Sequence, residues 1–215
     1  MTNDRRPRTR LDRRIAIIVV GAVAVSAAIA FLVWAWRSAE AAAGVQVIAG
    51  PGPINCEDGP ISLRTAEQYS EPAIVVRLEA KPGAWCQVPI SVRNTGPHTV
   101  TIDDLTFPAM REDKEGNHGA LIATGDASGV PPRGTELSND AIFDVGETIP
   151  AGETWTTLIR VEVNPYACND AGVWSVFDAP QVHLTALHRE HRVAGTIELA
   201  AAIDDEGLFW SGCAT

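Results

Sequence analysis

The sequence lacks the short motifs that mark the commonest catalytic and metal-binding sites. It contains no Gly-x-Ser-x-Gly segment, which would place a serine nucleophile on a sharp strand-to-helix turn. It contains no Cys-x-x-Cys segment, which would supply paired thiolates to zinc, and no Asn-x-Ser/Thr acceptor for N-glycosylation. Serine hydrolysis and structural zinc binding are therefore without a sequence signal. We predict no catalytic residue, no cofactor and no metal ligand.

Charge is missing from one long segment near the start of the chain. Ile15–Trp36 contains no charged residue, and Ser26 is its only polar side chain. A helix of this length spans about 33 Å, whereas the hydrocarbon core of a bilayer is about 30 Å thick. The segment predicts one transmembrane helix over residues 15–37.

The two flanks of this segment differ in charge, which predicts its orientation. Residues 1–14 carry six arginines and two aspartates, and an excess of arginine marks the cytoplasmic side. We therefore expect residues 1–14 to form a cytoplasmic tail and the rest of the chain to be extracytoplasmic, in the cell envelope. There are three alternatives. The segment could be a signal peptide that is cleaved at the small residues near Ser38–Ala43, a twin-arginine signal with its arginines at Arg13-Arg14, or a buried core helix. The length and uniform apolarity of the segment favour a permanent single-pass anchor in the cell membrane.

The part of the chain beyond the apolar segment is acidic. Residues 38–215 carry a net charge of −15, which excludes nucleic-acid binding through a phosphate-neutralising patch. The same charge predicts repulsion from anionic lipid and a domain that stands off the membrane. Residues 38–53 are rich in Ala, Gly and Pro and predict a stalk, and residues 54–215 have the length of one domain. The partners that we expect are the membrane and an envelope protein or cell-wall component.

All four cysteines follow the apolar segment, at Cys56, Cys86, Cys168 and Cys213. In an oxidising compartment an even number of cysteines predicts two disulfides. Four cysteines allow three pairings. The lower entropy cost of closing shorter loops favours Cys56–Cys86 together with Cys168–Cys213.

Short alternating segments, separated by turn residues, predict an all-β fold for the outer domain. Trp85–Asn94 is the clearest example: Cys86, Val88, Ile90 and Val92 share one face, and Pro89 on the other face indicates an edge strand or a bulge. The other strands that we expect are His98–Phe107, with an interruption at Asp103-Asp104, and Ala73–Glu79, Ala120–Ala123, Ala141–Val145, Thr154–Val163 and Leu208–Trp210. About eight such strands predict an antiparallel β-sandwich.

Two turn segments carry a resemblance to a known type of domain. They are Val88–Gly96, a strand that enters an Asn-x-Gly turn, and Pro150–Thr154, the turn before a later strand. With them, residues 85–163 resemble the immunoglobulin-like domains of bacterial envelope proteins, including the CARDB type. The resemblance implies an immunoglobulin-like sandwich in a protein that binds, spaces or scaffolds, and it assigns no functional residue.

Three histidines lie close together in the sequence, at His183, His188 and His191. We expect Val182–His188 and Val193–Leu199 to form a hairpin around residues 189–191, which would place His183 and His188 on opposite faces and His191 in the turn. A binding platform of Trp85, Trp155, Trp174 and Trp210 and a partial calcium loop at Arg111–Gly119 are further weak candidates.

The sequence thus predicts a membrane-anchored extracytoplasmic interaction or scaffold module without catalysis. An envelope metal-binding carrier or enzyme that uses the His183–His191 region is the alternative hypothesis. A structural spacer without a specific ligand is the third.

Overall fold

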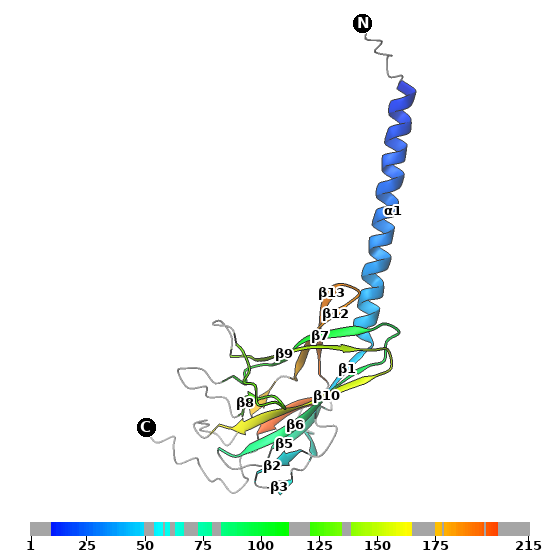
Figure 1. The fold of residues 1–215 in the computed structure, drawn as a ribbon. Helices are drawn as coiled ribbons and strands as arrows, with labels where there is room; N and C mark the ends of the chain where they lie inside the picture. Colours follow the sequence, from blue (N-terminus) through cyan, green and yellow to red (C-terminus); the bar gives the residue numbers. More distant parts are fainter. Residues whose placement is uncertain are drawn as a thin grey trace.

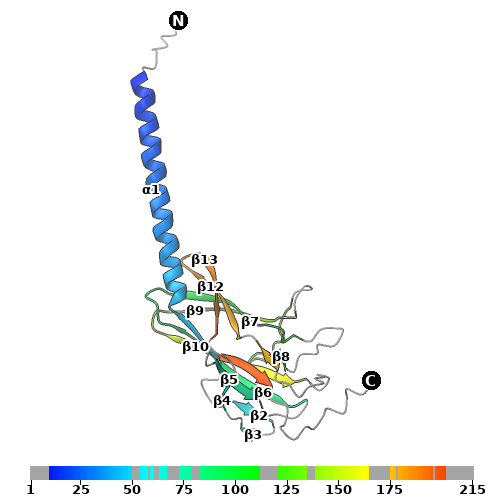
Figure 2. The same cartoon turned by 180° about the vertical axis from the view of Figure 1, so that it is seen from behind.

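The computed structural model consists of one long helix followed by an all-β domain, as the sequence predicts (Figure 1). The helix leaves the domain at the end where β12 and β13 lie, and the reverse view shows the same arrangement (Figure 2). The structure describes residues 10–49, 54–57, 59–60, 63–66, 73–78, 83–111, 121–134, 139–164, 175–177, 179–195 and 197–201.

Helix α1 (Arg10–Ala43) is longer at both ends than the predicted span. Its segment Ile17–Ala43 has a mean hydropathy of 2.7 and is long and apolar enough to cross a membrane. Ala is a strong helix former and Pro is absent from the segment, so nothing ends the helix before Gly44.

The expected stalk over residues 38–53 is wrong for residues 38–49. Ser38–Ala43 continue α1, and β1 (Val45–Ala49) pairs with β6 of the domain. Ser38, Ala41 and Ala42 are buried. The small residues that suggested a flexible linker instead allow the helix to pack closely on the domain.

The first sheet is built around β6 (Trp85–Asn94), in the order β3-β2-β6-β10-β8, with β1 also paired to β6. All its pairings are antiparallel. The predicted inward face of β6 is confirmed, because Cys86, Val88, Ile90 and Val92 are fully buried. The outward face is not open throughout, since Pro89 and Ser91 are buried as well. The other strands are β2 (Asn55–Cys56), β3 (Gly59–Pro60), β8 (Leu121–Gly125) and β10 (Thr154–Val163).

The expectation that Pro89 marks an edge strand is wrong, because β6 is paired along both sides. On one side Pro89 lies opposite Leu158 of β10. On the other side β1 ends at Ala49, opposite Ile90, and β2 begins at Asn55, opposite Gln87. Pro89 lacks an N–H group, and it occupies the position where the neighbouring strand changes from β1 to β2.

The second sheet has the order β13-β12-β7-β9 and is also antiparallel. Buried side chains of both sheets form one continuous hydrophobic core, in which Phe107 and Phe143 meet edge to face at 5.9 Å. The strands are β7 (Val100–Phe107), β9 (Ala141–Ile149), β12 (Gln181–Ala186) and β13 (Arg189–Ala194). Two sheets around one core confirm the predicted sandwich.

A third sheet departs from the predicted antiparallel pattern. It has the order β11-β14-β5-β4, and β14 pairs with β5 in parallel. Its strands are β4 (Leu63–Ala66), β5 (Ala73–Leu78), β11 (Ser175–Phe177) and β14 (Ile197–Ala201). Since β5 and β14 are far apart in the sequence, no local pattern predicts their pairing.

Candidate functional site

The β12–β13 hairpin carries the three histidines, but its turn is not where the sequence places it. The turn is Leu187-His188, and β13 begins at Arg189. His191 therefore lies in a strand. Leu187 and His188 have φ values of 49° and 64°, a left-handed geometry that two-residue hairpins require and that usually selects Asn or Gly. The sequence gives no such signal here.

The hairpin separates the histidines rather than bringing them together. His183 pairs with Arg192 and lies on the outer face, whereas His191 pairs with the buried Leu184 and lies on the opposite face. His188 lies in the turn and is exposed. Among the described residues, no group of three His, Cys, Asp or Glu side chains could hold a metal ion.

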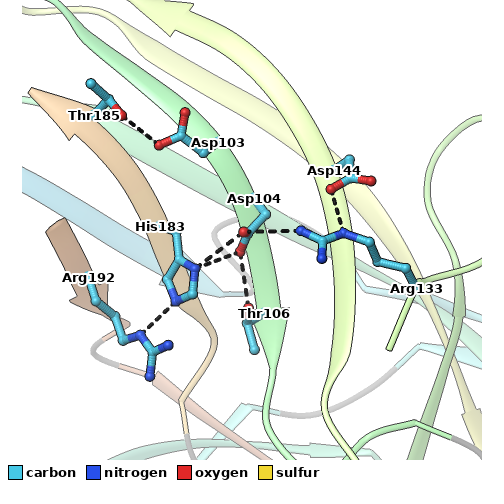
Figure 3. Close-up of polar contacts among 8 residues, drawn as sticks. All are labelled: Asp103, Asp104, Thr106, Arg133, Asp144, His183, Thr185 and Arg192. Carbon is cyan, nitrogen blue, oxygen red and sulfur yellow. Dashed lines mark hydrogen bonds and ion pairs between the residues drawn. The ribbon is translucent and has the colours of Figure 1, made fainter. Parts of the chain in front are cut away.

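A network of polar side chains covers the outer face of the second sheet, and we call it the outer polar cluster. Figure 3 shows its members around the carboxylate of Asp104. They are Asp103, Asp104 and Thr106 of β7, Asp144 of β9, His183 and Thr185 of β12, Arg192 of β13, and Arg133, which forms an isolated bridge with Ile142.

Asp104 accepts bonds from three side chains, although only 12% of its side chain is exposed. Thr106 Oγ1 donates to Asp104 Oδ1 at 3.2 Å, and His183 Nδ1 lies 3.2 Å from the carboxylate. Arg133 Nη2 lies 3.4 Å from Oδ2, and its Nε donates to Asp144 at 2.6 Å. A register shift between Ile102 and Asp104 accompanies this burial, in agreement with the interruption that the Asp103-Asp104 pair predicts.

The contacts of His183 fix its tautomer. Arg192 Nε donates to His183 Nε2 at 2.6 Å. Arginine has no acceptor atom, so Nε2 must be unprotonated and Nδ1 carries the proton that is donated to Asp104. The imidazole is thus neutral and held between a carboxylate and a guanidinium (Figure 3).

This geometry supports recognition better than acid–base chemistry. A general base needs a free ring nitrogen within reach of a substrate proton, and Nε2 of His183 is occupied by Arg192. Asp103, Asp104, His183, Glu190 and Arg192 are among the residues that line a shallow hollow of about 420 Å³. Sequence reasoning missed Arg133, Asp144 and Arg192, because no motif links residues so far apart along the chain.

The opposite face of the hairpin contacts the end of α1, and we call this contact the junction. Trp34 Nε1 donates to the carbonyl of Leu187 at 2.9 Å. The hydroxyl of Ser38, which is fully buried, donates to the carbonyl of Ala186 at 2.8 Å and lies 2.6 Å from His191 Nε2. Because the single Ser38 proton is used by that carbonyl, His191 Nε2 donates to the Ser38 oxygen.

Two charged or titratable groups of β13 complete the junction. Arg189 places its Cζ 5.5 Å from the centroid of the Trp34 ring and its Nη1 3.5 Å from the carbonyl of Ala35. Burial, together with the nearby Arg189 guanidinium, lowers the pKa of His191 below its ordinary value of 6.5. The neutral imidazole therefore suits the junction better than the imidazolium.

A close backbone contact fixes α1 to the turn after β6. A Cβ atom built on Gly44 would lie 2.7 Å from the Cα and N atoms of Gly96, so residue 44 must be glycine, whereas a Cβ atom built on Gly96 would lie 3.3 Å from the carbonyl oxygen of Ala41. The N–H of Thr95 donates to the carbonyl of Gly44 at 2.8 Å. This contact extends the junction to Gly44 and Gly96.

Asn94 joins the two turn segments on which the immunoglobulin-like resemblance depends. Its side chain is fully buried, and its Nδ2 donates to the carbonyls of His98, Ile149 and Pro150 at 2.8, 3.0 and 3.1 Å. Its Oδ1 accepts from the N–H of Gly96 at 3.0 Å. One side chain therefore holds the β6–β7 turn against the β9–β10 turn, next to the junction.

The remaining candidates are only partly described. Cys56 and Cys86 form a disulfide, the first of the two pairings that the sequence favours, and Cys168 and Cys213 lie outside the described residues. Trp85 stacks under the Arg160 guanidinium at 4.6 Å, and Trp155 packs against the core, so these two do not form a joint open platform. Trp174, Trp210 and the segment after Arg111 that resembles part of a calcium loop also lie outside the described residues.

Comparison with solved structures shows only distant similarity. A structural genomics target, SoR45, covers 77% of this chain and 90% of its own at 10% identity, with a TM-score of 0.36. For an inactive mutant of a GH20 exo-β-N-acetylglucosaminidase from Vibrio harveyi, the match covers 75% of this chain and 19% of the enzyme at 10% identity, with a TM-score of 0.36. For a PapD-like domain of human CEP192, it covers 60% of this chain and 81% of that domain at 10% identity, with a TM-score of 0.29. Similarities this low carry no functional argument.

At the level of sequence, no curated protein matches this chain significantly. A family model does match it, over residues 15–198, and so covers both the apolar helix and most of the β-domain. The chain belongs to the family described as a domain of unknown function, DUF8453.

Proposed function

We propose that this protein is a single-pass membrane protein whose β-domain is an extracytoplasmic immunoglobulin-like interaction module, without catalytic activity. The basic N-terminal tail would be cytoplasmic and the domain would lie in the cell envelope. The observation that carries the proposal is the unbroken connection of an apolar helix to a folded domain, sealed by the junction.

The exposure of α1 supports a membrane anchor rather than a soluble core helix. Apart from the half-buried Trp34, its large apolar side chains from Ile17 to Trp36 are 46% to 70% exposed. In water such a surface would be very unfavourable, because each buried CH₂ group contributes about 0.8 kcal/mol. Lipid would cover it, as the Arg residues before the apolar run and the Trp residues at the end of that run also suggest.

The junction argues against removal of α1 as a signal peptide. A cut near Ser38–Ala43 would remove the hydroxyl that bonds to Ala186 and His191, and the Trp34 ring that packs on Arg189. It would leave the buried positions of Ala41 and Ala42 open to solvent. A helix that contributes buried residues to the mature fold is favoured as a permanent part of the protein.

The outer polar cluster is the surface that we assign to a partner. It presents exposed charge of both signs around a nearly buried carboxylate, with side chains held in place by one another. Such a preorganised polar surface costs little side-chain entropy on binding. The partner that fits is an envelope protein with a complementary polar surface.

The location is tested by protease digestion of intact cells and of cells with an opened envelope. We expect protease to cut the β-domain in at least one of the two preparations. We also expect the Cys56–Cys86 disulfide to be intact and the protein to remain in carbonate-washed membranes. A domain protected in both preparations, or an N-terminus mapped to residues 39–44 in the mature protein, would contradict the proposal.

The interaction surface is tested by crosslinking in native membranes. We expect a specific crosslinked partner for the natural protein, loss of that partner for Arg192→Ala, and its retention for Arg93→Ala, a matched exposed arginine of β6 on the other sheet. Equal crosslinking by both variants would reject the outer polar cluster as the contact. A bound metal released by chelator would favour the alternative metal-carrier hypothesis.

A further inference from the structure

The apolar helix has no spare length between the membrane and the domain. The apolar run from Ile15 reaches Trp34, which already donates to the carbonyl of Leu187 in the domain, and Ile15–Trp34 spans about 30 Å as a helix, which equals the hydrocarbon thickness. Ser38 is already fully buried in the protein. With α1 in a bilayer, the domain must therefore lie directly on the membrane surface rather than stand off from it.

The β12–β13 turn lies at the same height as the end of the apolar run. The carbonyl of Leu187 is 2.9 Å from Trp34 Nε1, and Arg189 Nη1 is 3.5 Å from the carbonyl of Ala35. Figure 1 shows the ends of β12 and β13 beside α1, on the helix side of the other strands. The β12–β13 turn therefore lies beside the part of α1 where the exposed apolar side chains of the helix end.

The turn keeps an unfavourable backbone at this position. Leu187 and His188 both have positive φ, a region that costs side-chain-bearing residues energy and that Asn or Gly would enter more easily. His188 is exposed. Backbone strain retained at a tip commonly accompanies a functional role of the side chains there.

The charges next to the turn complement a phosphate surface. In the described part of the chain no carboxylate pairs with Arg189, whose contacts are the Trp34 ring and the Ala35 carbonyl. Arg37 directly follows the apolar run of α1 and is exposed, and no carboxylate in the described part of the chain pairs with it. These cations contrast with the acidic charge of the domain as a whole. Guanidinium groups bind phosphate through two parallel bonds.

We propose that the β12–β13 turn is a second membrane contact, in which Arg189 and Arg37 bind the phosphates of phospholipid headgroups and Leu187-His188 lies at the lipid boundary. The inference rests on the membrane anchoring proposed above, and it reverses the sequence-based expectation of a domain that stands off the membrane. The strong acidic charge would then face away from the lipid, toward the envelope.

The test uses the full-length protein in native membranes, with photoreactive benzophenylalanine in place of His188. We expect irradiation to give a phospholipid adduct, seen as a mass increase of the turn peptide. The matched control carries the same group in place of Glu57, an exposed position next to β2, at the end of the domain farthest from α1 (Figure 1), and should give no lipid adduct. A protein adduct at position 188, or no adduct, would overturn the inference.

A second measurement isolates the phosphate contact. In vesicles of phosphatidylcholine with one-third phosphatidylglycerol, Arg189→Gln should lower the adduct yield at position 188 about fivefold. Glu190→Gln, which removes a charge from the other face of β13, should not lower the yield. An unchanged yield in Arg189→Gln would overturn the phosphate contact. If the protein is not retained in washed membranes at all, the proposed anchoring itself fails, which distinguishes the two outcomes.

Discussion

His183 and His191 lie on the same hairpin, eight positions apart, yet their surroundings differ in kind. His183 belongs to the outer polar cluster, where Asp104 and Arg192 bind its two ring nitrogens. His191 belongs to the junction, where the hydroxyl oxygen of Ser38 accepts a hydrogen bond from its Nε2, and burial and the nearby Arg189 disfavour its charged form. The outer cluster is a surface of mutually bonded charges, whereas the junction is a packed contact between the helix and the domain.

This comparison separates residues that hold the protein together from residues that are available to a partner. At and beside the junction, several contacts are between backbone atoms or involve fully buried side chains, as for Gly44, Ser38 and Asn94. In the outer cluster, Arg133 and Asp144 remain 51% and 73% exposed while they pair. Substitutions should therefore reduce stability strongly at the junction and weakly in the cluster.

The largest effect is expected for Asn94→Ala, directly behind the junction. The substitution removes the side-chain donor to the carbonyls of His98 and Ile149 and the acceptor of the Gly96 N–H. We expect a loss of about 3 kcal/mol in the free energy of unfolding, measured by denaturant titration of the full chain in detergent. Thr95→Ala, which removes one exposed hydroxyl contact, is the control, and an equal loss in both variants would show that Asn94 has no special role.

Gly44→Ala should follow, with a loss of about 2 kcal/mol, because the new methyl group meets the backbone of Gly96 rather than a movable side chain. The same measurement applies. The matched control is Gly21→Ala in the exposed part of α1, where nothing lies within 4 Å of the added Cβ. If Gly44→Ala behaves like this control, the helix end is not clamped on the domain.

A smaller effect is expected in the outer cluster. Asp104→Asn keeps the shape of the side chain but removes the charge that pairs with Arg133 and that accepts the hydrogen bond of His183. We expect a loss of about 1 kcal/mol. For Asp144→Asn the loss should be under about 0.5 kcal/mol, since that carboxylate is exposed. A loss for Asp104→Asn as large as that of Asn94→Ala would abolish the distinction between the two regions.

The smallest effect is a dependence of stability on pH that originates in the junction. Because the pKa of His191 is lowered in the folded protein, the unfolded chain binds the proton more readily. The contribution of His191 to the free energy of unfolding is therefore fully present above pH 6.5 and decreases as the pH falls below 6.5. Melting curves at pH 7.5 and 5.5 should show a smaller pH difference for His191→Gln and for Arg189→Gln than for the natural protein. An identical pH difference in all three would contradict this assignment.

Local pattern predicted the parts of the fold whose signal is contained in one segment. The apolar run predicted the helix, and the two-residue alternation of Trp85–Asn94 and Thr154–Val163 predicted central strands of the sandwich. The Asp103-Asp104 pair predicted the register shift that buries Asp104. In each case the residues that decide the structure are neighbours along the chain.

The other features could not be predicted because distant contacts override the local preference. Leu187-His188 has no turn composition, and the hairpin is closed there because β12 and β13 pair in that register. The Ala- and Gly-rich segment after Trp36 has the composition of a linker, but its small side chains are what the junction requires. The outer polar cluster combines residues that are up to 89 positions apart, from Asp103 to Arg192.

Helix α1 continues without a break to Gly44, which lies against the backbone of Gly96, and this contact sets the orientation of the whole domain about the helix axis. Each helical residue advances the chain by about 1.5 Å and rotates it by about 100°. One residue added to or removed from the helix before Gly44 would therefore rotate the β-domain by more than a quarter turn about the axis of α1. In a protein anchored as proposed, the length of α1 would thus decide which face of the domain is turned toward a neighbour in the same membrane.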